Sequence, residues 1–112
     1  MSRFSYETAV RGTLAIVALR GELDLLATSA LEPELERLAD VPGIDIVALD
    51  LRALDFLDSN GLRAVVLAAT RFTDRERRLV LVRGSSPVQR VFEITRMTER
   101  LEFVDAPEHA LN

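Results

Sequence analysis

Apolar residues in the first part of the chain follow a two-residue period. Residues 3–9 alternate loosely, and residues 13–24 carry aliphatic side chains at alternate positions with further aliphatic side chains between them. A nearly continuous apolar run of this length favours a strand that is covered on both faces. We therefore expect two strands joined near Arg11 and Gly12, the second largely buried and punctuated by Gly21.

The next segment changes to helical spacing. Three leucines within residues 31–38 fall on one helical face, and charged residues occupy the other. Ser29 and Glu32 have the form of a capping box, and Pro33 would cost a hydrogen bond deeper in a helix. These signals predict an amphipathic helix that begins one residue after Ser29 and ends at residues 41–43.

Strand-like and helical segments then alternate to the end of the chain. Such alternation implies parallel crossovers, because parallel neighbours need a long connection between them. We therefore expect an α/β fold with one mixed sheet of four to five strands, two antiparallel strands first, and helices packed on it. The expected elements are a central strand from Ile44, a helix after Gly61 with Leu62, Val65, Val66, Ala69 and Phe72 on its core face, a strand over Leu79–Val82, a helix capped by Ser86 with Pro87 at its first position, a short strand near Phe103 and a turn from Pro107.

The composition agrees with one folded domain. The chain has 112 residues, of which 48% are hydrophobic and 29% are charged. A chain of this length buries enough surface to fold without metals or disulfides. No Gly/Ser-rich or Pro-rich linker interrupts the pattern, so we expect a single domain over residues 1–112.

Missing residue types narrow the possible chemistry. The chain has no cysteine, and His109 is its only histidine, so thiolate chemistry is excluded and a histidine-built metal site has no second ligand of its kind. The chain also has no lysine, which excludes a P-loop nucleotide site, a Schiff base and a lysine-dependent receiver domain. We expect neither a metal nor a cofactor.

Charge and hydropathy exclude two classes of partner. The net charge of -4 argues against a nucleic-acid binder, and the densest basic stretch, residues 71–78, is interleaved with Asp74 and Glu76 as in a solvated helix end or loop. No apolar run approaches the roughly 18 residues needed to span a bilayer, and the first residues do not read as a secretory leader. We expect no nucleic-acid partner, no membrane association and a cytoplasmic location.

The most informative segment for function is residues 47–62. It places Asp55, Asp58, Ser59 and Asn60 after a buried strand and before Gly61 and an amphipathic helix, where α/β sheets usually carry their sites. In one interpretation these residues only cap the helix and shape its entry. In another, Ser59 is an exposed hydroxyl at a helix N-terminus, where the helix dipole favours an added phosphate. The spacing alone leaves both open.

Two enzymatic interpretations of the same segment are weaker. A catalytic serine needs a base, but the only histidine is His109 near the C-terminus, and the chain has no G-x-S-x-G turn. A magnesium site built from Asp24, Asp55 and Asp58 is conceivable by residue type, although acidic residues on loop rims are mostly solvated.

Three segments together resemble the STAS-domain anti-sigma factor antagonists of bacteria: GELD at residues 21–24, LDLRALDFLDSNGL at residues 49–62, and SSPVQRVFEITRM from Ser85. The resemblance covers almost the whole chain, and its centre is the family segment L-x-F-[LIM]-D-S-[ST]-G-L at residues 54–62. Two positions depart from the family pattern. Asn60 stands where serine or threonine is usual, and Arg96 stands where a glycine commonly follows the third helix.

The resemblance implies a partner-switching role. Ser59 would be phosphorylated by a partner that is both anti-sigma factor and serine kinase, with Asp24 and Asp58 beside it. The unphosphorylated protein would bind the anti-sigma factor and free the sigma factor, phosphorylation would abolish binding, and a serine phosphatase would reset the switch. The protein itself would catalyse nothing.

The same resemblance gives an expected docking face and an alternative. Around Ser59, we expect the partner to contact Asp24, Asp58, Asn60, Gly61 and Arg63. Because Asn60 departs from the family pattern, a STAS module that is never phosphorylated, acting as a scaffold or binding a small ligand, remains the alternative. A small enzyme is the third and most distant possibility.

Overall fold

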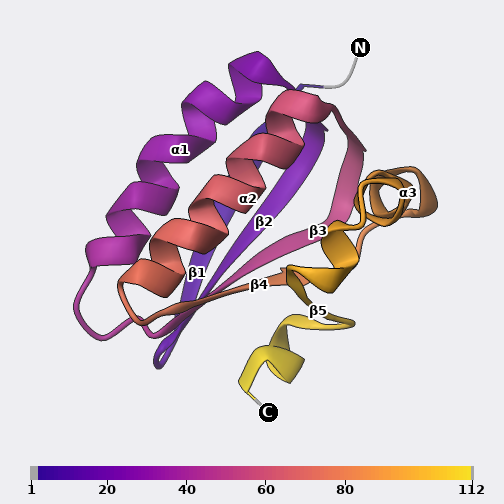
Figure 1. The fold of residues 1–112 in the computed structure, drawn as a ribbon. Helices are drawn as coiled ribbons and strands as arrows, with labels where there is room; N and C mark the ends of the chain where they lie inside the picture. The colour runs from indigo at the N-terminus through magenta and orange to yellow at the C-terminus, as the bar shows by residue number, and fades with distance from the viewer. Residues whose placement is uncertain (1–2, 112) are drawn as a thin grey trace.

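The computed structural model of the chain describes residues 3–111 and has a single five-stranded mixed sheet with its strands side by side in chain order (Figure 1). The strands are β1 (Ser5–Arg11), β2 (Leu14–Leu23), β3 (Ile46–Leu57), β4 (Arg78–Val82) and β5 (Glu102–Val104); the helices are α1 (Leu25–Asp40), α2 (Ser59–Asp74) and α3 (Ser86–Ile94), with short 3-10 helices η1 (Met97–Glu99) and η2 (Pro107–Leu111). β1 and β2 are antiparallel, and the other neighbouring pairs are parallel. The predicted mixed sheet, with β3 at its centre, is confirmed.

The N-terminal hairpin matches the two predicted strands, with one difference at Gly21. Gly12 has φ +61° in the connecting turn, as a tight hairpin requires. β2 does not stop at Gly21 but continues to Leu23, and the pairing with β3 shifts register between Gly21 and Glu22. Gly21 has φ +88°, and a β-carbon there would lie 2.1 Å from the carbonyl oxygen of Arg3. Glycine is therefore required at this irregular point of the strand, where the backbone of Arg3 approaches closely.

α1 begins five residues earlier than the capping-box signal predicts. The Asp24 carboxylate accepts a hydrogen bond from the backbone N–H of Ala27 at 2.9 Å and is the N-cap, whereas Ser29 lies inside the helix. The prediction of a start after Ser29 was therefore wrong. Burial of Ala27 and Thr28 stabilises the first turns, and the exposed Pro33 is accommodated within the helix.

The other two helices differ from the prediction in smaller ways. In α2 the buried residues are Gly61, Ala64, Val65, Ala68 and Phe72, so its core face is rotated from the predicted one, and Leu62, Val66 and Ala69 are only half-buried. Ser85 rather than Ser86 occupies the N-cap position of α3, without a capping hydrogen bond from its side chain, so Pro87 is at the second helical position. After α3, Arg96 adopts φ +63°, the left-handed conformation in which glycine is unstrained.

The core has two layers of unequal size. α1 and α2 lie side by side over one face of the sheet (Figure 1), where leucines of α1 and Phe72 of α2 pack on β2 and β3. α3 packs against β3 through Val88 and Phe92. The opposite face carries a smaller cluster around Leu14 that is covered by η2 through Ala110.

The sheet register places the two long helices at a common start. β2 and β3 run parallel, and Leu23 pairs with Leu57 at their carboxyl ends. α1 follows directly after Asp24, and α2 follows directly after Asp58, so both helices begin at the same sheet edge. Across residues 3–111, no helix has both the length and the apolar character needed to cross a bilayer.

Candidate functional site

Two aspartates stand at equivalent positions at this sheet edge. Asp24 caps α1 by accepting from Ala27 N, and Asp58 caps α2 by accepting from Gly61 N, each at 2.9 Å. Each carboxylate thereby satisfies one of the free backbone N–H groups at its helix start and complements the positive end of the helix dipole. Asp58 is thus the N-cap of α2, and Asp24 has the same role in α1.

Ser59 is the first residue of α2, and its side chain is exposed. Asp58 supplies the cap, so the Ser59 hydroxyl is not needed to satisfy the helix backbone. The first turn of α2 contains no acidic residue. A phosphate at this position would therefore meet a helix N-terminus that favours negative charge.

Gly61 allows the start of α2 to lie directly against the end of β2. A β-carbon at Gly61 would lie 2.3 Å from the carbonyl oxygen of Leu23 and 3.0 Å from a side-chain carbon of Leu57. The backbone N–H of Asp58 also donates to the same carbonyl oxygen of Leu23 at 3.3 Å. The close packing at Gly61 thus determines the position of the first turn of α2, and with it the position of Ser59.

Asn60 and Arg63 extend the site along α2. Both side chains are exposed, and both line a groove of about 230 Å³ between the N-terminal halves of α1 and α2. Leu25 and Glu32 of α1 line the same groove. The structure therefore brings together at one end of the molecule Asp24, Asp58, Ser59, Asn60, Gly61 and Arg63.

The structure does not support the two enzymatic interpretations. Within residues 3–111 there is no group of three acidic or histidine side chains able to hold a metal ion, so Asp24, Asp55 and Asp58 form no such cluster. Asp55 lies within β3 and not after it. His109 lies in η2, at the opposite end of the molecule from the start of α2 that carries Ser59 (Figure 1).

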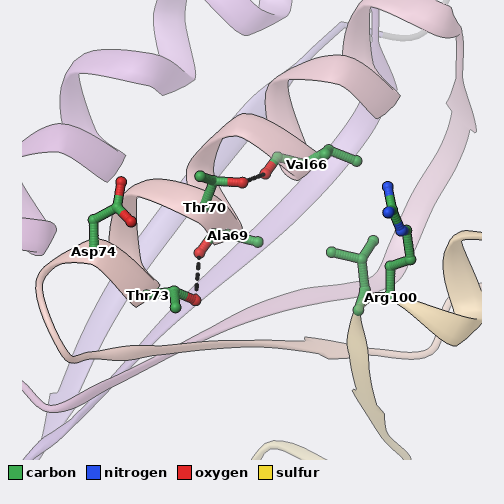
Figure 2. A pocket seen from close by; sticks show the side chains of 7 residues that line it. Val66, Ala69, Thr70, Thr73, Asp74 and Arg100 are labelled. Carbon is green, nitrogen blue, oxygen red and sulfur yellow. Dashed lines mark hydrogen bonds between the residues drawn. The ribbon is translucent and has the colours of Figure 1, made fainter.

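A larger groove, which the sequence did not indicate, lies at the other end of α2. It has a volume of about 370 Å³ and runs between the last turns of α2 and the segment before β5 (Figure 2). The Thr70 and Thr73 hydroxyls donate to carbonyl oxygens of their own helix, those of Val66 and Ala69. The hydroxyl protons are thus used inside α2, and Arg100 is the cationic side chain in the lining.

The acidic groups with lowered pKa values lie away from Ser59. Burial of Asp50 favours its neutral form, but hydrogen bonds from the Arg52 guanidinium and backbone N–H outweigh it, so the pKa of Asp50 lies below its ordinary value. Hydrogen bonds from Arg37, assisted by the Thr8 hydroxyl, likewise lower the pKa of Glu34 despite its partial burial. In both cases the hydrogen bonds from an arginine stabilise an ionised carboxylate, and these contacts have a structural role.

Comparison with known proteins agrees with the geometry. The model of the STAS domain family matches residues 5–110. BtrV of Bordetella bronchiseptica, which carries the name of an anti-sigma factor antagonist, is 37% identical over 82 residues, or 73% of this chain and 70% of BtrV.

Solved structures share the fold. An anti-sigma factor antagonist from Mycobacterium paratuberculosis superposes with a TM-score of 0.85 at 22% identity, covering 97% of this chain and 92% of that one. The anti-sigma factor antagonist SpoIIAA in its unphosphorylated form superposes with a TM-score of 0.78 at 21% identity, covering 97% and 93%. The phosphorylated form of SpoIIAA, a Bacillus cell fate determinant, gives 0.72 at 20% identity, covering 97% and 96%.

Proposed function

The chain belongs to the STAS domain family, as its motifs predicted, and on that basis we propose that it is an anti-sigma factor antagonist switched by phosphorylation of Ser59. In its unphosphorylated form the protein binds an anti-sigma factor that is also a serine kinase, and this binding releases a sigma factor. The observation that carries the proposal is the exposed Ser59 hydroxyl at the start of α2, which Asp58 leaves free by capping the helix.

The covalent steps belong to the partners. The kinase transfers the γ-phosphoryl group of ATP to Oγ of Ser59, the hydroxyl proton is released, and ADP leaves. A serine phosphatase then hydrolyses the phosphoserine with water to restore the hydroxyl and release inorganic phosphate. The chain contributes the acceptor and the docking face and acts as substrate in both reactions.

The change in charge explains the loss of binding. A phosphate adds about -1.5 to -2 charges at neutral pH, next to Asp58 and close to Asp24. The helix N-terminus tolerates this charge, so the protein need not refold. Binding is lost because a partner surface that fits a hydroxyl now faces a hydrated dianion that must be desolvated. Moving a complex from nearly all bound to nearly all free takes about 5.5 kcal/mol, which one buried, unpaired dianion can supply.

The residues around Ser59 have either a structural role or a role in partner contact. Asp24 and Asp58 hold the two helix starts in place, and Gly61 sets the height of α2 against β2. Asn60 and Arg63 lie one turn apart on α2, and both are exposed at the same groove. In this proposal both contact the partner directly. Asn60 keeps a polar, uncharged side chain at the position next to the acceptor.

An affinity capture from the native cell lysate tests the proposal. The baits are the wild-type protein, Ser59→Ala and Ser59→Asp, and mass spectrometry identifies both the bound proteins and the state of Ser59. We expect an ATP-binding kinase-like protein to be held by wild type and Ser59→Ala but released by Ser59→Asp, with phosphate found on Ser59. Equal capture by all three baits with unmodified Ser59 would instead identify an unswitched scaffold or ligand-binding STAS module.

A further inference from the structure

Three leucines are exposed beside the candidate site, although leucine is normally buried. Leu25 and Leu26 form the first turn of α1 and are 63% and 83% exposed, and Leu67 on α2 is 51% exposed. We call these three residues the leucine patch. Because α1 begins at Leu25 and not five residues later, Leu25 and Leu26 stand on the helix directly after the Asp24 cap.

Two shallow grooves flank the leucine patch. Leu25 and Leu67 line the groove of about 230 Å³ between α1 and α2 that also contains Asn60 and Arg63. Leu26 lines a second groove of about 300 Å³ on the β1 side of α1, together with Phe4. The patch therefore lies between two grooves. It is continuous with the proposed docking face through Asn60 and Arg63.

Acidic residues border the patch. Glu22 and Asp24 line the groove beside Leu26, Glu32 lines the groove beside Leu25, and Asp58 lies next to Ser59. The seven ion pairs found within residues 3–111 all involve other carboxylates. Arg3 and Arg63 are the cations in the two groove linings, where they are outnumbered by three carboxylates, those of Glu22, Asp24 and Glu32.

We propose that the leucine patch is a second part of the docking surface, which binds an apolar area of the anti-sigma factor bordered by arginine or lysine side chains. This inference rests on the proposed function and adds the residues that set affinity. Charge complementarity selects the occupant, because a second copy of this chain would bring the same acidic border against itself. Ser59 switches binding, whereas the leucine patch contributes affinity to the complex that the unphosphorylated protein forms.

The two kinds of contact affect different rate constants. Apolar side chains that become buried in a complex act mainly on dissociation, whereas charges at the border of an interface act mainly on association and on its salt dependence. A leucine change should therefore raise the dissociation rate constant. A charge change at Glu32 should lower the association rate constant at low salt and reduce its dependence on salt.

The test measures binding kinetics by biolayer interferometry with the kinase-like protein that wild-type bait captures, purified on its own. The variants are Leu26→Ser and Leu67→Ser, with Ile94→Ser as the matched control because Ile94 is 74% exposed on α3. We expect each leucine variant to dissociate about tenfold faster and Ile94→Ser to match wild type. Glu32→Gln, compared with Glu93→Gln on α3, should show the slower and less salt-dependent association.

The Ser59 variant and the leucine variants together distinguish a failure of this inference from a failure of the proposed function. If wild type binds and Ser59→Asp does not, but both leucine variants dissociate like wild type, the leucine patch is not part of the interface and the switch stands. If the wild-type protein holds no partner, both proposals fail. Thermal unfolding of each variant excludes misfolding as the cause, since these side chains are exposed and their replacement should leave the melting temperature nearly unchanged.

Discussion

The missing side chain of Gly61 lets α2 approach the carbonyl oxygen of Leu23, from which a β-carbon at this position would lie only 2.3 Å away. Gly61→Ala must therefore push the start of α2 off the end of β2. We expect a loss of more than ~2 kcal/mol in the free energy of unfolding, measured by urea denaturation, together with weaker partner binding.

Gly12→Ala is the matched control for Gly61→Ala. Gly12 has φ +61°, but a β-carbon there would meet open space. Its replacement should cost only the left-handed backbone strain of about 1–2 kcal/mol and leave partner binding intact. A Gly61→Ala variant that is as stable as Gly12→Ala and binds normally would contradict the close approach.

The two aspartate caps predict a specific order of stability among their variants. Asp24→Ala and Asp58→Ala each remove one 2.9 Å hydrogen bond to a helix N–H, so each should lose about 1 kcal/mol of stability. Asp24→Asn and Asp58→Asn keep an oxygen that can accept this bond and should lose less. Calorimetry of the four variants checks the order, and an alanine variant as stable as its asparagine counterpart would rule out the capping role.

The sequence predicted the elements well and the placement of side chains less well. Asp58, Ser59 and Gly61 could be singled out because a cap, a hydroxyl and a glycine at a strand-to-helix junction are local signals. Asp24 was placed beside Ser59 only through the family resemblance. Its capping position, equivalent to that of Asp58, could not be derived from local signals, since it depends on the register of β2 against β3, in which Leu23 lies opposite Leu57.

The start of α1 shows how a local signal can mislead. Ser29 and Glu32 match a capping box, but the first turns of α1 are decided by the burial of Ala27 and Thr28 against the core, which the motif does not contain. The same error hid the leucine patch, because Leu25 and Leu26 were placed before the helix. Tertiary packing, and not helix propensity, determines this boundary.

Pro33 within α1 should be a site where stability can be gained. Proline has no N–H to donate to the preceding turn, and Pro33 lies in an exposed position in the middle of a 16-residue helix. Pro33→Ala should raise the free energy of unfolding by roughly 2 kcal/mol, the helix gain of about 3 kcal/mol less the greater freedom of the unfolded chain. Urea denaturation, with Glu32→Ala as control, checks this, and an unchanged or lower stability would show that α1 bends to suit the proline.

Asp50 predicts a specific dependence of stability on pH. The pKa of Asp50 is lowered in the folded protein because Arg52 outweighs the effect of burial, so the folded state holds this proton less tightly than the unfolded state. The resulting stabilisation is fully present above the ordinary pKa of 3.8 and is lost as pH falls through the lower folded value. Asp50→Asn should therefore lose less stability than wild type between neutral pH and pH values below 3.8.

Urea denaturation across this acidic range measures the difference in pH dependence. Asp105→Asn is the control, because Asp105 pairs with Arg83 at 2.7 Å but its side chain is 76% exposed. We expect Asp105→Asn to follow the wild-type curve. Identical curves for wild type and Asp50→Asn would show that the contact with Arg52 contributes nothing to stability.

Phosphorylation of Ser59 should switch binding without rearranging the fold. Ser59 is exposed, Asp58 already caps α2, and the helix N-terminus favours the added charge, so nothing in the core needs to move. We expect the phosphorylated protein and Ser59→Asp to melt within about 4 °C of wild type, which for a domain of this size corresponds to about 1 kcal/mol. Backbone amide shifts in NMR spectra should change at the starts of α1 and α2 and stay constant in β2, β3 and β4. Widespread shift changes in these strands would mean that the phosphate acts by rearranging the core and not by blocking the partner surface.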